Sequence, residues 1–220
     1  MAHFAPRSED LPGEIGVFPL EGALLLPGGR LPLNIFEPRY LALTESALAT
    51  GRLFGMIQPD PHAPAGPAGP GLYRVGCLGR IISFSETEDG RYLLTLAGVT
   101  RFAVGEELAG TRGFRRVRAR YEEFADDLAP AAAPAFDREA LLEALRLYFR
   151  TRAIETNWEA IRQIPDAQLI TTLAMGCPFE PSEQQALLEA PAATDRATAL
   201  AALLRMGGHR RGEGSGSNPS

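Results

Sequence analysis

Short hydrophobic runs, rich in β-branched and aromatic residues, occupy the first 124 residues of the chain. Gly and Pro separate the runs, a pattern typical of an antiparallel β-barrel or sandwich. Asp89-Gly90, between the fourth and fifth runs, is a dipeptide typical of a hairpin turn. The pattern predicts six strands, over residues 15–20, 31–36, 52–57, 72–85, 91–104 and 114–124.

One helix is expected to interrupt these strands, over residues 38–50. Pro38 suits the first position of a helix, and Gly51 suits its end. Apolar and small residues recur between them at helical spacing, namely Tyr40, Leu41, Thr44, Ala47 and Leu48.

The hydrophobic period becomes helical after a Pro- and Ala-rich linker at 128–136. Pro181 and Thr194 are suitable helix starts, and Gly176 and Gly207 are suitable stops. The expected helices cover residues 136–153, 157–164, 166–176, 181–190 and 194–206. The sequence therefore predicts an α+β protein, with a β-barrel domain at 13–127 and a compact helical bundle at 136–206. Regular structure is not expected in the Pro/Gly loop 61–71 or in the termini, 1–12 and 207–220, which we expect to be flexible.

Charge and composition exclude several classes of protein. The 220 residues carry a net charge of −5, and all 22 basic residues are Arg. A P-loop, a Schiff base and a Ser–Lys dyad each require Lys, which the chain lacks. Two distant Cys, no apolar stretch long enough for a membrane helix and no signal-peptide pattern favour a reducing, cytoplasmic location.

No residue pattern indicates catalysis. The three histidines, His3, His62 and His209, lie in the terminal segments and the Pro/Gly loop, where no partner would hold an imidazole in place. Cys77 and Cys177 are expected to be structural. We therefore expect no catalytic residue, no metal and no cofactor. A small-molecule enzyme remains an alternative, and a deep pocket with two or more titratable groups in contact would indicate one.

The basic run 111–120 is the clearest charge feature. In a strand, Arg116, Arg118 and Arg120 would share one face with Phe114, as in a surface that binds RNA or anionic peptides. The alternative is an exposed face that the acidic stretch 122–127 balances. The net negative charge argues against nucleic acid, so RNA binding is kept as a second hypothesis.

Residues 15–40 resemble the amino-terminal substrate-binding domain of the Lon ATP-dependent protease family. The resemblance lies in Phe18-Pro19-Leu20, Leu25-Leu26-Pro27-Gly28 and a string that ends in Glu37-Pro38-Arg39-Tyr40. Asn34 stands where the family often has His. Shorter motifs follow in the expected order through Gly98-Val99-Thr100-Arg101-Phe102.

The resemblance implies a twisted, antiparallel PUA-like β pseudobarrel followed by a helical bundle. It also implies binding of unfolded or degron-bearing polypeptides, or of a partner protein. Because the sequence ends at Ser220 with neither an ATPase nor a protease module, we expect a free-standing, non-enzymatic binding module, acting as an adaptor in protein quality control.

The recognisable string has a plain structural interpretation. Leu33, Ile35 and Phe36 are expected to pack inside the barrel, and Glu37 to favour the positive end of the helix that follows. Arg39 is expected to brace a neighbouring strand. A polypeptide groove between barrel and bundle is the hypothesis for Trp158, Met175 and Phe179, and the alternative is that these three residues form part of the bundle core.

Overall fold

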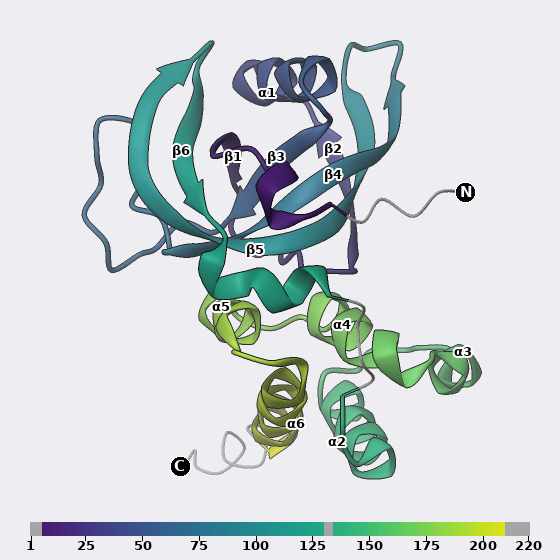
Figure 1. The fold of residues 1–220 in the computed structure, drawn as a ribbon. Coiled ribbons are helices and arrows are strands. Elements are labelled where there is room, and N and C mark those ends of the chain that lie inside the picture. The colour runs from purple at the N-terminus through teal and green to yellow at the C-terminus, as the bar shows by residue number, and fades with distance from the viewer. Residues whose placement is uncertain (1–5, 130–133, 210–220) are drawn as a thin grey trace, which may run out of the picture.

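A computed structural model describes residues 6–129 and 134–209. Figure 1 shows a β-barrel lying against a group of helices. The strands are β1 (Glu14–Pro19), β2 (Arg30–Ile35), β3 (Leu53–Ile57), β4 (Val75–Glu86), β5 (Tyr92–Thr111) and β6 (Phe114–Arg120). The α-helices are α1 (Pro38–Ala49), α2 (Arg138–Thr151), α3 (Trp158–Gln163), α4 (Asp166–Gly176), α5 (Pro181–Glu189) and α6 (Ala193–His209). Two 3-10 segments, η1 (Ser8–Asp10) and η2 (Glu122–Leu128), complete the described elements, and the predicted α+β class is confirmed.

The strands form one sheet in the order β2-β5-β4-β3-β1-β6, and β5 also pairs with β6. This extra pairing closes the barrel and leaves β2 as an edge strand among the described strands. The sheet is mixed rather than antiparallel throughout, because β1 pairs with β3 in parallel, with Val17 opposite Gly55. The connection from β1 to β3 contains β2 and α1, which is long enough for the crossover that a parallel pair requires.

Strand β5 extends beyond its predicted end at residue 104. It continues to Thr111 because its second half pairs with β6, from Ala103 opposite Arg120 to Thr111 opposite Phe114. The turn between the two strands is Arg112-Gly113, and both residues have positive φ. Only the pairing with β6 reveals that this polar stretch of β5 is a strand.

One hydrophobic core joins the barrel to the bundle. Buried residues of both parts belong to the same cluster, among them Leu26 and Leu96 from the barrel and Leu145 from α2. Met175 of α4 lies so close to Gly29 that a Cβ there would overlap the Met175 sulfur. A smaller cluster fills the barrel around Val17, Phe102 and Val117.

Two segments differ from what the sequence predicts, and parts of others lie outside the described residues. Residues 8–10 form η1, and Leu11 is buried in the smaller cluster, so the described part of 1–12 does not lack structure. Helix α6 does not stop at Gly207 but continues through it to His209. A Cβ at position 207 would lie 2.6 Å from the Tyr148 ring, so the glycine permits close packing of α6 against α2. Residues 130–133 of the predicted linker lie outside the described residues, as do 1–5 and 210–220 of the predicted flexible termini. In the described ranges, no helix is long and apolar enough to span a bilayer.

Candidate functional site

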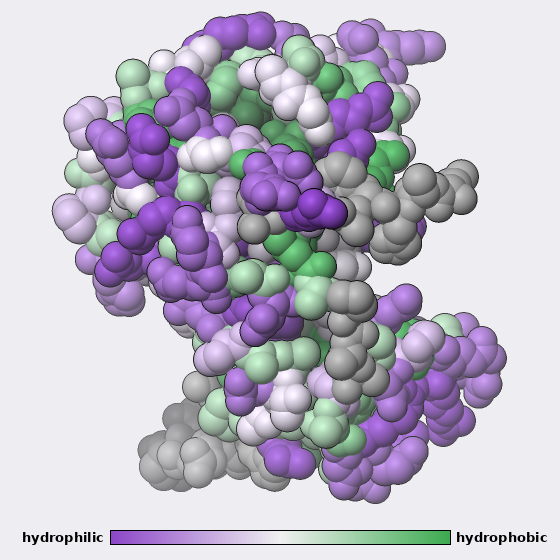
Figure 2. All heavy atoms as spheres, in the orientation of Figure 1, coloured by the Kyte–Doolittle hydropathy of each residue, from purple (hydrophilic) through white to green (hydrophobic). Residues whose placement is uncertain are grey.

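Exposed hydrophobic residues concentrate on three neighbouring strands of the barrel, β2, β5 and β4. Of the five large hydrophobic residues that are exposed in the described chain, four lie on β4 or β5 or just after β2, namely Phe36, Ile82, Phe84 and Leu93. The fifth, Met206, lies on α6. In the view of Figure 2, hydrophilic residues cover the outer side of α2 and α3, whereas hydrophobic residues reach the surface of the barrel.

The exposure of Phe36 corrects the prediction that this residue packs inside the barrel. Its side chain is 62% exposed, whereas Ile35 beside it is buried and Leu33 is half-buried. Ile35 is the last residue of the edge strand, and the chain then turns into α1 at Pro38. Phe36 therefore occupies the bend between two elements, where no neighbouring strand covers it.

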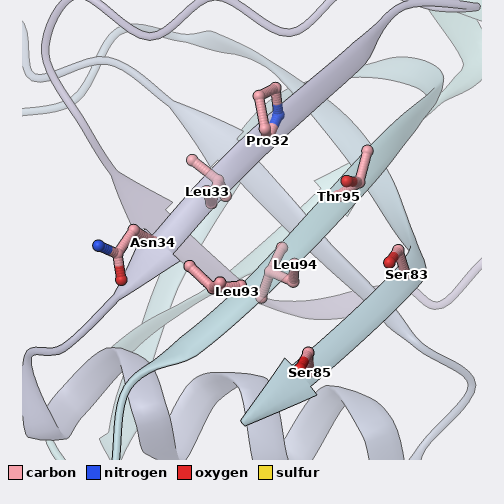
Figure 3. Close-up of a pocket in the computed structure, with 8 residues that line it drawn as sticks. All are labelled: Pro32, Leu33, Asn34, Ser83, Ser85, Leu93, Leu94 and Thr95. Carbon is pink, nitrogen blue, oxygen red and sulfur yellow. The ribbon is translucent and has the colours of Figure 1, made fainter. Parts of the chain in front are cut away.

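A shallow groove of about 420 Å³ crosses β2, β5 and β4. We call it the β2 groove, and Figure 3 shows its lining side chains. Cross-strand neighbours build it, because Asn34 lies opposite Leu93 and Leu93 opposite Ser85. The lining consists of Pro32, Leu33, Asn34, Ser83, Ser85, Leu93, Leu94 and Thr95.

The β2 groove contains no ionisable side chain. Its polar groups are hydroxyls and one amide, which exchange hydrogen bonds but perform no acid–base chemistry near neutral pH. A charged ligand group would lose hydration there without gaining a countercharge. The arrangement therefore suits uncharged apolar side chains next to peptide groups.

The recognisable string at residues 37–40 forms a closed local unit next to this groove. Arg39 pairs with Glu37 at 2.8 Å and lies over the ring of Tyr40 at 4.6 Å. Tyr40 is buried against Phe18, and burial raises the pKa of its phenol while Arg39 lowers it. Arg39 thus braces the carboxylate of its own string, and the Glu37 carboxylate makes no capping hydrogen bond to the helix.

Acidic residues pair with much of the basic run on β6. Arg116 pairs with Glu14 at 2.8 Å, and Arg118 lies 3.6 Å from Glu14 and 3.9 Å from Glu106. Arg120 is exposed. The acidic stretch that follows β6 was expected to supply the negative charges that balance these Arg side chains. Glu14 on β1 and Glu106 on β5 supply them instead. Pairing across the sheet makes these contacts, and the linear sequence does not reveal them.

The three predicted groove residues lie apart in one core. Phe179 is buried, with its ring 5.5 Å from that of Tyr148. Trp158 packs on Phe149 at 5.9 Å, and Met175 faces Gly29 of the barrel. These contacts are those of core packing, which was the alternative interpretation. The groove hypothesis for the three residues stays a prediction.

An interaction that the sequence reasoning missed lies at the junction of barrel and bundle. The Arg101 guanidinium of β5 pairs with Asp127 at 2.8 Å, with side chains only 4% and 10% exposed. It also donates to the carbonyl oxygens of Leu188, Ala190 and Pro191, which follow or end α5. These are the carbonyls that a helix C-terminus leaves unpaired, so Arg101 of the barrel caps α5 of the bundle. An Arg in the otherwise uncharged run 94–104 was the signal available in the sequence.

Further polar contacts lie at this junction and beside it in the bundle. Gln58, just after β3, donates to Pro181 O at 3.0 Å and to Gln185 at 3.3 Å, and Gln185 donates to Val75 O. Arg196 of α6 is buried and donates through Nε to Leu187 O at 2.8 Å. Burial, with a contribution from Arg101, lowers the pKa of Arg196.

The cysteines are held as thiols. Burial raises the pKa of Cys77 above its ordinary range and that of Cys177 to about 12, which opposes thiolate formation. His62 is exposed in the Pro/Gly loop, and the side chains of His3 and His209 lie outside the described residues. No group of three or more metal-ligating side chains occurs in the residues that the structure covers.

Comparison with known proteins identifies the family to which this fold belongs. The model of the ATP-dependent protease La (LON) substrate-binding domain matches residues 14–205. The chain belongs to this family. The chain is similar to the crystal structure of a Lon N-terminal domain protein from Xanthomonas campestris, with 25% identity and a TM-score of 0.57. The match covers 86% of this chain and 97% of the Xanthomonas chain. The N-terminal domain of the Mycobacterium avium complex Lon protease, at 17% identity and a TM-score of 0.59, covers 87% of the chain and 97% of its own and shares the fold.

The Lon proteases that the chain matches are much longer than the chain. Lon protease 1 of Bdellovibrio bacteriovorus is 28% identical over 199 residues, which is 86% of this chain and 24% of that protein. Lon protease of Anaeromyxobacter dehalogenans is 29% identical over 100 residues, 46% of this chain and 12% of that protein. The chain therefore corresponds to the substrate-binding part of such proteases, and that domain alone is not catalytic.

Proposed function

We propose that this Lon substrate-binding domain protein binds unfolded or degron-bearing polypeptides through the β2 groove and the exposed Phe36, without chemical change to them. The observation that carries the proposal is the uncharged groove with Leu93 and Phe36 exposed beside it. Apolar side chains grouped at a groove are a mark of an interaction site. Unfolded chains expose the apolar side chains that a folded protein buries.

The test is fluorescence anisotropy with a labelled, reduced and carboxymethylated α-lactalbumin, which stays unfolded. Phe36→Ser and Leu93→Ser should each weaken binding about tenfold, because full burial of such a side chain contributes about 1.5–3 kcal/mol and about half of each is still exposed in the free protein. Met206→Ser is the matched control, since Met206 is an exposed hydrophobic residue on α6. No binding by the wild type, or equal binding by all three variants, would refute the proposal.

We further propose that the bound polypeptide is passed to a protease, so that the chain acts as an adaptor. The family supports this role, because its members recognise substrates for proteolysis. The measurement is the degradation rate of the same labelled α-lactalbumin by a Lon protease, with and without the chain. An increase that Leu93→Ser abolishes supports the adaptor role, and an unchanged rate contradicts it.

RNA binding remains the second candidate, and the ion pairs of Arg116 and Arg118 argue against it. In a filter assay at low salt we expect no retention of single-stranded RNA. Retention that Arg118→Gln and Arg120→Gln reduce would reverse this ranking.

A further inference from the structure

Strand β2 presents one unpaired edge. Its six residues pair with β5 alone among the described strands, and β5 continues the sheet on that side. In the described part of the chain, no other backbone group hydrogen-bonds to residues 30–35. An edge strand of this kind offers free N–H and C=O groups at the spacing of a strand.

Pro32 shows which backbone groups face outward. Proline has no N–H, so it is tolerated in an edge strand where that position faces away from the neighbouring strand. Residues in an antiparallel strand direct their backbone groups alternately to the two sides. Arg30 and Asn34 therefore face the free edge together with Pro32. The edge offers the N–H groups of Arg30 and Asn34 and the C=O groups of all three.

We infer that β2 receives one segment of an extended, uncharged polypeptide as an added β-strand. This inference rests on the proposed function and specifies how the polypeptide is bound. A helix satisfies its own backbone groups and has none to offer such an edge, whereas an extended chain pairs with it in series. Added next to β2, the segment would place alternate side chains beside Pro32 and Asn34, on the face that carries the β2 groove. On the other face it would cover the half-buried Leu31 and Leu33.

Backbone pairing explains how one surface accepts many sequences. Every polypeptide carries the same N–H and C=O groups, so affinity from the edge is independent of sequence, and the uncharged groove selects against charged side chains. The missing donor at Pro32 shortens the series of hydrogen bonds. Binding is therefore weaker than at an edge without proline.

The test measures displacement of labelled, carboxymethylated α-lactalbumin by a capped peptide of alternating valine and threonine. In a second peptide, two adjacent central amides are N-methylated, which removes a donor from both edges of the strand. A control peptide carries the two extra methyl groups as Val→Ile changes. We expect the N-methylated peptide to bind at least fivefold more weakly, about the effect of one lost hydrogen bond, and the control to bind like the parent.

Variants of the protein supply the second arm. Asn34→Pro removes an outward N–H and the Asn34 side chain, whereas Asn34→Thr replaces the side chain and keeps the N–H. Peptide binding by Asn34→Pro should therefore be about fivefold weaker than binding by Asn34→Thr, and equal binding by the two variants would contradict strand addition. If Asn34→Pro fails to fold, hydrogen exchange in the wild type decides, because peptide pairing should slow exchange of the Asn34 amide.

The outcomes separate the two proposals. Equal displacement by the parent and N-methylated peptides, with α-lactalbumin still bound, overturns strand addition and leaves polypeptide binding intact. Absence of α-lactalbumin binding overturns the proposed function itself. Dimerisation in sedimentation that Asn34→Pro abolishes would assign the edge to a second copy and overturn the inference.

Discussion

Replacing Arg101 by Met should loosen the bundle from the barrel. The substitution removes the bidentate pair with Asp127 and the hydrogen bonds to Leu188, Ala190 and Pro191. It leaves a carboxylate buried without its partner, since the Asp127 side chain is 10% exposed. Removing one member of a buried pair costs about 3–5 kcal/mol, because the remaining charge keeps its desolvation penalty. This is a large part of the roughly 5–15 kcal/mol that stabilises a typical domain.

Urea unfolding followed by two probes measures this effect. Trp158 is the single Trp of the chain and lies in α3, so its fluorescence reports on the bundle, while circular dichroism reports on all elements. In Arg101→Met we expect the fluorescence transition to move to lower urea and to separate from the main dichroism transition. The double variant Arg101→Met, Asp127→Leu should recover part of the lost stability, because it also removes the unpaired carboxylate.

Arg116→Met is the matched control for this prediction. Arg116 pairs with Glu14 at the same 2.8 Å, but both side chains are substantially exposed, at 33% and 44%. An exposed pair contributes only about 0–1 kcal/mol, so this variant should unfold close to the wild type. If Arg101→Met and Arg116→Met lost equal stability, the assigned role of the buried pair would be wrong.

Two further predictions concern packing and pH. Gly98→Ala should cost about 1–3 kcal/mol in urea unfolding, because a Cβ there would overlap the Leu26 carbonyl, whereas Gly13→Ala, with open space around it, should not. Burial raises the pKa of Tyr148 to about 12, against about 10 in the unfolded chain, so its contribution to stability is complete below about pH 10 and is lost between about pH 10 and 12. Tyr148→Phe should therefore show a smaller loss of unfolding free energy between pH 9 and pH 11.5 than the wild type, and an identical loss would contradict the assignment.

Elements with local signals were predictable from the sequence to within a few residues. Pro38 and Gly51 enclose α1, and Asp89-Gly90 lies in the turn between β4 and β5, as their conformational preferences require. The string at residues 37–40 identified the family. In each case the residues that carry the information are close together in the sequence.

Features that depend on pairing between distant segments were not predictable. The second half of β5 is polar, and only the neighbouring β6 makes it a strand. As a glycine, Gly207 suits the end of a helix, but here it lies inside α6. Its role is to let α6 pack against Tyr148 of α2. A pattern of hydrophobic residues describes which positions prefer burial and not which partner is available.

The candidate site shows the same limit in its strongest form. The apolar pattern predicted burial for Phe36, and Phe36 is exposed because the strand that would cover it is absent among the described elements. Arg101 lies in a run of uncharged residues. It can be buried because η2 supplies its countercharge and the end of α5 supplies its carbonyl acceptors. Both residues depart from their expected environment at a boundary, one at the sheet edge and one at the junction.

An exposed edge with hydrophobic residues beside it is also a hazard, because identical edges can pair and aggregate. Short length and a proline are two features that limit such pairing. Strand β2 has both, with six residues and Pro32. Two copies of β2 paired with each other would lack two donors, one from each Pro32. A proline-free chain paired with β2 lacks only the donor at Pro32. The proline therefore lowers self-association more than it lowers binding of a foreign segment. Replacing Pro32 by Val should then raise both affinity for unfolded α-lactalbumin and dimerisation, with the larger increase in dimerisation; a larger increase in peptide affinity would contradict this account.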